Sequence, residues 1–82
     1  MDSITHLDGN DVIVLDPFGR RVPAVTEVRV EPDRAVVAVT HEAGEWWQSL
    51  PVLARNAMLA CAIHSRDGGR LHWRGLVRLS CE

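Results

Sequence analysis

Residues 70–81 carry the densest set of side chains with binding chemistry in this 82-residue chain, in the order RLHWRGLVRLSC. A β-strand alternates its side chains between two faces. As a strand, this segment would present Arg70, His72, Arg74 and Arg78 on one face and a mainly apolar set, including Trp73, on the other. Guanidinium groups make two-point contacts with carboxylates and phosphates. The segment therefore indicates a surface for an acidic partner.

Three uses of these arginines stay open at this point. They could pair across strands with Glu27 and Glu31, contact the phosphates of a nucleic acid, or bind an acidic patch on another protein. Nucleic acid is the weaker of the two binding interpretations, because the chain has a net charge of −2 and Trp73 faces away from the arginines. The favoured partner is a protein, and nucleic acid is the alternative.

The adjacent pair Trp46-Trp47 is a second candidate for binding. Neighbouring residues of a strand or helix do not both face the core, so at least one indole is expected to be partly exposed. Tryptophan is enriched among the residues that dominate binding energy at interfaces. Both residues are candidate apolar anchors. The alternative is one core residue and one residue at its rim.

Cys61 and His64 have the spacing of one helical turn, and His72 and Cys81 would complete a zinc set by residue type. His72 and Cys81 are far apart on one predicted strand and on its opposite faces, which argues against such a site. The common nucleophile, metalloprotease and nucleotide-binding motifs are absent from the sequence. We expect no catalytic residue, no metal ligand, no cofactor and no enzyme activity. A disulfide between Cys61 and Cys81 stays open.

Composition is that of an ordinary globular protein, with 46% hydrophobic and 24% charged residues. Residues 1–45 hold nine acids and four arginines, whereas residues 46–82 hold two acids and five arginines. We expect one domain spanning residues 1–82. No signal peptide or membrane-spanning run is recognised, so the expected location is the cytoplasm, away from membranes.

Strands are predicted at residues 11–16, 22–31, 34–41 and 70–81, where β-branched residues or alternation dominate. The first three would form an antiparallel meander, with the third at the centre of the sheet. Residues 1–10 are polar and contain a predicted turn at residues 8–10. Residues 50–64 are rich in Ala, Leu and Met, which favours a helix capped by Ser49. Residues 42–50 fit either a short strand or a helical lead-in.

These elements predict an α+β fold in the order β-β-β-α-β, with an antiparallel sheet of about four strands and one helix packed on a face. A small SH3-like barrel followed by a C-terminal extension is the alternative. The predicted function is a non-catalytic module that binds a macromolecule, in the first place a protein. A small inhibitor or accessory protein of the phage or mobile-element type fits this description, and a homodimer is a further alternative.

Overall fold

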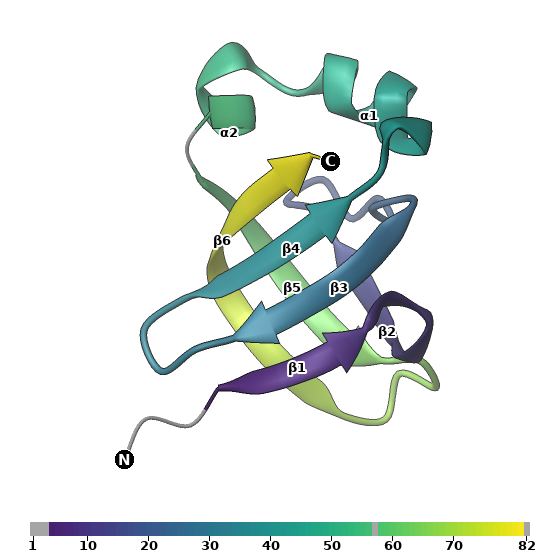
Figure 1. The fold of residues 1–82 in the computed structure, drawn as a ribbon, viewed down its shortest axis with the longest axis vertical. Coiled ribbons are helices and arrows are strands. Elements are labelled where there is room, and N and C mark those ends of the chain that lie inside the picture. Colours follow the sequence, from purple (N-terminus) through teal and green to yellow (C-terminus); the bar gives the residue numbers. More distant parts are fainter. Residues whose placement is uncertain (1–3, 57, 82) are drawn as a thin grey trace.

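The computed structural model describes residues 4–56 and 58–81. The fold is α+β and consists of one mixed six-stranded sheet and short helical segments (Figure 1). The strands are β1 (Thr5–Asp8), β2 (Val12–Leu15), β3 (Val25–Val30), β4 (Ala35–Val39), β5 (Met58–Ser65) and β6 (Leu71–Cys81). The helices are α1 (Gly44–Ser49) and α2 (Val52–Asn56), and single 3-10 turns occupy η1 (Gly9–Asp11) and η2 (His41–Ala43).

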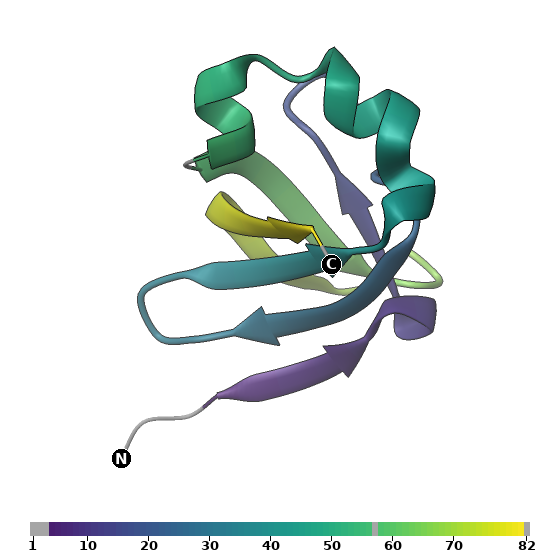
Figure 2. The same ribbon diagram turned by 45° about the horizontal axis from the view of Figure 1, so that its top comes forward.

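The strand order is β1-β3-β4-β6-β5-β2, in which β4 and β6 are parallel and all other neighbours are antiparallel. The two ends of this order, β1 and β2, are separated in the chain by η1 alone. The sheet consequently curls on itself, as both views show, and α1 and α2 lie across one end of the curl (Figures 1 and 2).

Alternating apolar residues fill the inside of the curl. Val14, Val28, Val37, Ile63 and Val77 are at most 1% exposed and come from β2, β3, β4, β5 and β6. This period of two is the reason why these segments are strands, since each places one face on a shared core. From α1, Trp46 and then Leu50 just beyond its end complete the core.

The predicted strands at 11–16, 22–31, 34–41 and 70–81 are present with shorter bounds, and β4 does lie inside the sheet. The predicted meander is only half right. The β3–β4 hairpin forms, with Glu31 N–H bonded to Arg34 C=O at 2.8 Å, but β2 pairs with β5 rather than with β3. The place beside β3 belongs to β1, an unpredicted strand in the polar N-terminal segment.

The predicted helix over residues 50–64 is wrong. Of its described residues, Val52–Asn56 are helical and those from Met58 onward belong to β5. Ser49 does not cap a helix start but ends α1, where its hydroxyl donates to the Trp46 carbonyl at 2.6 Å. The second half of the segment alternates, with Leu59, Cys61 and Ile63 buried. Pairing with both β2 and β6 outweighs the helical preference of Ala, Leu and Met.

Two further expectations need correction. The sheet has six strands rather than about four, and it is not purely antiparallel. The curl is closed by β5 and β6 as well as by earlier strands, so it is not an SH3-like barrel of the first fifty residues with an extension. Residues 41–49 are helical, which decides between the two predictions for that segment. No helix among the described residues is long and apolar enough to span a membrane.

Candidate binding surface

Strand β6 carries the alternation predicted for it over most of its length. Arg74, Leu76 and Arg78 point outward, while Val77 and Leu79 are buried. The pairing shifts between β5 and β6, so that Ile63 faces Trp73 and His64 faces Leu71, which leaves His72 as the extra residue of a bulge. The alternation therefore reverses there, and Leu71 is 47% exposed.

The outward residues of β6 lie beside apolar residues of both neighbouring strands. In the register, Arg78 lies between Val36 of β4 and Met58 of β5. Leu76 is 56% exposed and Met58 is 38% exposed. We call Arg74, Leu76, Arg78 and Met58 the β6 surface. This surface combines two guanidinium groups with two large apolar side chains.

Cross-strand neutralisation of these arginines by Glu27 and Glu31 does not occur, because β6 pairs with β4 and β5 and not with β3. Glu27 Oε1 instead lies 2.9 Å from His6 Nδ1, and Glu31 Oε2 accepts from Arg29 Nε at 3.0 Å. Within residues 4–56 and 58–81, no acidic side chain forms an ion pair with Arg70, Arg74 or Arg78. The charge of the β6 surface is thus uncompensated by these acids.

Arg70 and His72 are not part of the β6 surface. Arg70 lies in the turn between β5 and β6, where its N–H donates to Ser65 Oγ at 3.0 Å. Both residues line a hollow that opens between the beginning of β6 and strand β1. The predicted basic set is therefore divided by the bulge into two adjoining regions.

The two tryptophans of α1 have different positions. Trp46 is only 8% exposed, and its Nε1 donates to Asp16 Oδ2 at 3.0 Å. Trp47 is partly buried and packs against the core, with its ring centroid 6.3 Å from that of Trp46. Trp46 is thus a core residue in this structure, and the pair follows the arrangement of one core residue and one residue at its rim.

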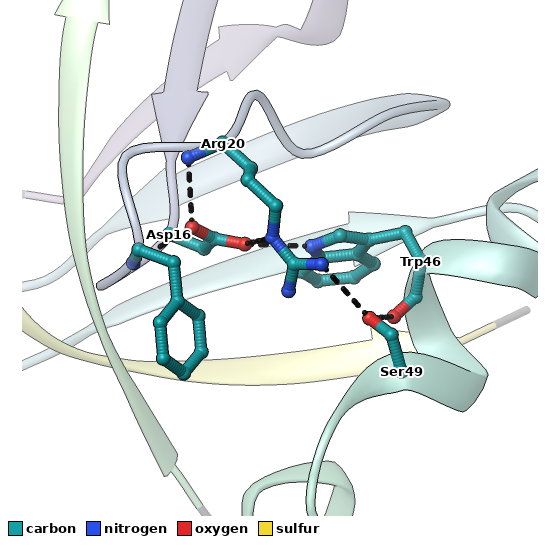
Figure 3. Close-up of polar contacts among 5 residues, drawn as sticks. Asp16, Arg20, Trp46 and Ser49 are labelled. Carbon is teal, nitrogen blue, oxygen red and sulfur yellow. Dashed lines mark hydrogen bonds and ion pairs between the residues drawn. The ribbon is translucent and has the colours of Figure 1, made fainter.

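Sequence reasoning missed the polar cluster around Asp16, a carboxylate at the end of β2 that is 5% exposed (Figure 3). It accepts from the N–H groups of Phe18 and Arg20 and from Arg20 Nε, each at 2.9 Å, as well as from Trp46. Burial alone raises the pKa of Asp16, but these hydrogen bonds outweigh it and hold the pKa below the ordinary 3.8.

The Asp16 cluster connects the β2–β3 loop to α1. Arg20 Nη1 donates to Ser49 Oγ at 3.2 Å, and its guanidinium carbon lies 5.3 Å from the centre of the Phe18 ring. Phe18 itself is 69% exposed. The sequence Asp-Pro-Phe-Gly at residues 16–19 has the residue types of a turn, but nothing in these types signals that the carboxylate is buried.

The two cysteines do not form a disulfide. Both are free, with Cys61 buried and Cys81 exposed. Cys61 and His64 lie three residues apart on β5 rather than on a helix, so they face opposite sides. Burial, and secondarily the charge of Asp16, raises the pKa of the Cys61 thiol to about 12. Residues 4–56 and 58–81 contain no group of three or more His, Cys, Asp or Glu side chains that could hold a metal ion.

Comparisons with protein-family models, curated proteins and solved structures find no match to this chain. The function is therefore inferred from the geometry of the site. That geometry offers an exposed surface of apolar side chains and of arginines that no acid within residues 4–56 and 58–81 pairs with.

Proposed function

We propose that this protein is a non-catalytic binding module that docks an acidic region of another protein on the β6 surface. The observation that supports the proposal is that no acid in the described part of the chain pairs with Arg74 or Arg78, between which Leu76 is exposed. A small inhibitor or accessory protein is the class that fits such a module. Because Trp46 is buried, the proposed contact does not use it.

The chemistry of the β6 surface suits a protein interface. Interfaces combine an apolar centre with charged groups that set orientation and association rate. Leu76 and Met58 would supply apolar contact, and the guanidinium groups would bind carboxylates in two-point contacts. Arginine is also better suited than lysine to interfaces, since its guanidinium group is less strongly hydrated.

The connectivity of the sheet favours nucleic acid as a second candidate. With β1 and β2 counted as halves of one bent strand, the fold resembles the five-stranded Greek-key barrel of the OB-fold, which binds oligonucleotides on the face of its second and third strands. Here that face is formed by β3 and β4. It carries a hollow of about 170 Å³ lined by Glu27, Arg29, Val36, Ala38 and Ser80.

Two features of this face weigh against nucleic acid. Its arginine is already paired, because Arg29 is bonded to Glu31, and its other charged residue, Glu27, is an acid. Among the described residues, no Trp or Phe side chain lies on it or on the β6 surface: the tryptophans belong to α1 or pack against the core, and Phe18 lies on the β2–β3 loop. Single-strand binders use exposed aromatic rings as stacking platforms. Protein binding is therefore the better supported function.

The test is affinity capture from an extract of the native host at about 150 mM salt, where exposed charge pairs are partly screened. Wild-type protein is compared with the double variant R74E/R78E and with the control R21E, which reverses an exposed arginine of the β2–β3 loop. We expect one protein partner that wild type and R21E retain and that R74E/R78E loses by at least about tenfold, or 1.4 kcal/mol.

Two outcomes contradict the proposal. Capture that is equal for R74E/R78E and wild type shows that the β6 surface is not the docking site. The nucleic-acid alternative is established instead by two results together. Capture disappears after nuclease treatment, and labelled single-stranded DNA or RNA binds in a salt-sensitive manner in an anisotropy titration.

A further inference from the structure

The first half of β6 has an open edge. Residues 77–81 of β6 pair with β4 on one side, whereas residues 71–76 pair, in the part of the chain that the structure describes, with β5 alone. Gly75 has a φ of +147°, a backbone conformation that glycine favours, and it lies just before the pairing with β4 begins. The strand therefore bends away from β4 at this point. Its free backbone groups over about six residues resemble those of an edge strand.

This open edge faces a gap in the curled sheet. Within residues 4–56 and 58–81, strand β1 pairs with β3 alone, and its second edge is also free of strand neighbours. A hollow of about 260 Å³ lies between the two regions. It is lined by Thr5, Leu7, Val30, Arg70, Leu71 and His72.

At the other end of the strand order, a loop covers the edge of β2. The β2–β3 loop folds back on β2, where Val22 N–H donates to the Val14 carbonyl at 2.8 Å and Leu15 forms a bridge with Arg21. The loop thus satisfies backbone groups that an edge strand would expose. Among the described residues, the chain covers the edge of β2 with its own loop and leaves the β1–β6 gap without such a cover.

We propose that a short extended segment of an acidic protein partner adds to residues 71–76 of β6 and fills the gap beside β1. This inference rests on the proposed function and specifies the form in which the partner binds. Strand addition gains affinity from main-chain hydrogen bonds and specificity from alternate side chains.

The side chains around the gap define the chemistry of this segment. Leu7, Val30 and Leu71 would contact apolar residues pointing into the hollow. Arg70 and the outward Arg74 carry charge that no acid within residues 4–56 and 58–81 pairs with. A strand of alternating apolar and acidic residues satisfies both requirements, whereas a basic strand would be repelled.

The test uses a fluorescein-labelled octapeptide of alternating Glu and Val, titrated with the full chain by fluorescence anisotropy. Two matched isomers carry N-methyl groups either on the Val or on the Glu residues, which removes the backbone donors along one edge of the strand and preserves charge. We expect one isomer to bind at least about tenfold more weakly and the other to bind like the parent peptide. Amide exchange of residues 71–76 should slow when the parent peptide is bound.

Several outcomes overturn the inference. They are equal binding of all three peptides, no binding of any of them, or equal binding of a peptide with Lys in place of Glu. A doubled mass in sedimentation equilibrium, with slow amide exchange at residues 71–76 before any peptide is added, would show that a second copy covers the edge.

These failures are distinguishable from failure of the proposed function. If the peptides bind equally well while R74E/R78E still loses the captured partner, the β6 surface is a docking site and strand addition is wrong. If R74E/R78E captures the partner as well as wild type does, the proposed function itself is wrong.

Discussion

The buried carboxylate of Asp16 holds the β2–β3 loop and α1 together, because the hydrogen bonds that it accepts come from these two elements. Phe18 and Arg20 belong to the β2–β3 loop, and Trp46 belongs to α1. A buried carboxylate is costly unless it is fully hydrogen-bonded. The ion therefore stabilises the native arrangement only while both the loop and the helix remain docked.

The Trp46 indole donates one of the hydrogen bonds that satisfy the buried Asp16 carboxylate. We expect Trp46→Phe to lower the free energy of unfolding at pH 7 by about 1.5–3 kcal/mol, because it removes a hydrogen bond to a charged group. Trp47→Phe makes the same change in a half-buried neighbour of the same helix and should cost less. Urea unfolding of both variants and wild type measures the difference.

The pH dependence separates this hydrogen bond from lost packing. The pKa of Asp16 is lowered in the folded state, so its contribution is fully present above the ordinary value of 3.8 and disappears as the pH falls through the lower folded pKa. The deficit of Trp46→Phe should therefore shrink between about pH 5 and pH 2. A deficit that stays constant over this range would attribute the whole effect to packing.

At the scale of elements, the sequence predicts what depends on local pattern. The β3–β4 hairpin and β6 were predictable because their residues alternate and their turns have clear residue types. The helix over residues 50–64 was wrong because burial on alternate positions of β5, together with pairing on both sides, decides that segment. Strand β1 escaped prediction because its residues THLD are largely exposed and β3 alone pairs with them.

In the candidate site too, the features that depend on local pattern were predictable and those that depend on strand pairing were not. The outward arginines of β6 followed from period two, but their lack of acidic neighbours depends on strand order. No local pattern specifies that β4, and not β3, lies beside β6. The bulge at His72, which separates Arg70 and His72 from the β6 surface, likewise arises from pairing and has no signal in the sequence.

The corner between β1 and β2, formed by η1, lies in close contact with β3. A methyl group on Gly9 would lie 1.9 Å from the carbonyl oxygen of Val25 in β3, which is backbone and cannot rotate away. We expect Gly9→Ala to cost about 1–3 kcal/mol of stability by displacing this corner from β3. Gly44→Ala is the control, since nothing lies within 4 Å of the added carbon and the residue is helical.

Thermal unfolding followed by circular dichroism measures both glycine variants. Gly44→Ala should match wild type or exceed its stability by up to about 1 kcal/mol, as expected for alanine in a helix. A Gly9→Ala protein as stable as wild type would mean that the corner can be rearranged at no cost. The curl of the sheet would then not depend on close contact between η1 and β3.

At the scale of the whole molecule, the curl explains how a short chain obtains a core. A chain of this length buries a modest share of its surface, and a flat sheet would expose one apolar face. By curling, β2, β3, β4, β5 and β6 place their buried residues on a single core, which Trp46 and Leu50 complete from the α1 end. The inner face is used for stability, which leaves only the outer face and the open edges for binding.

Sharing of one core by all these elements predicts a single cooperative unfolding transition. Tryptophan fluorescence reports largely on α1 and on Trp73 of β6, whereas far-ultraviolet circular dichroism reports on the sheet. The two signals should give the same urea midpoint, because undocking α1 would expose the core and leave Asp16 buried without its Trp46 donor. An earlier fluorescence transition would contradict this expectation. It would show that α1 detaches as a separate unit and that the sheet is stable without its helical cap.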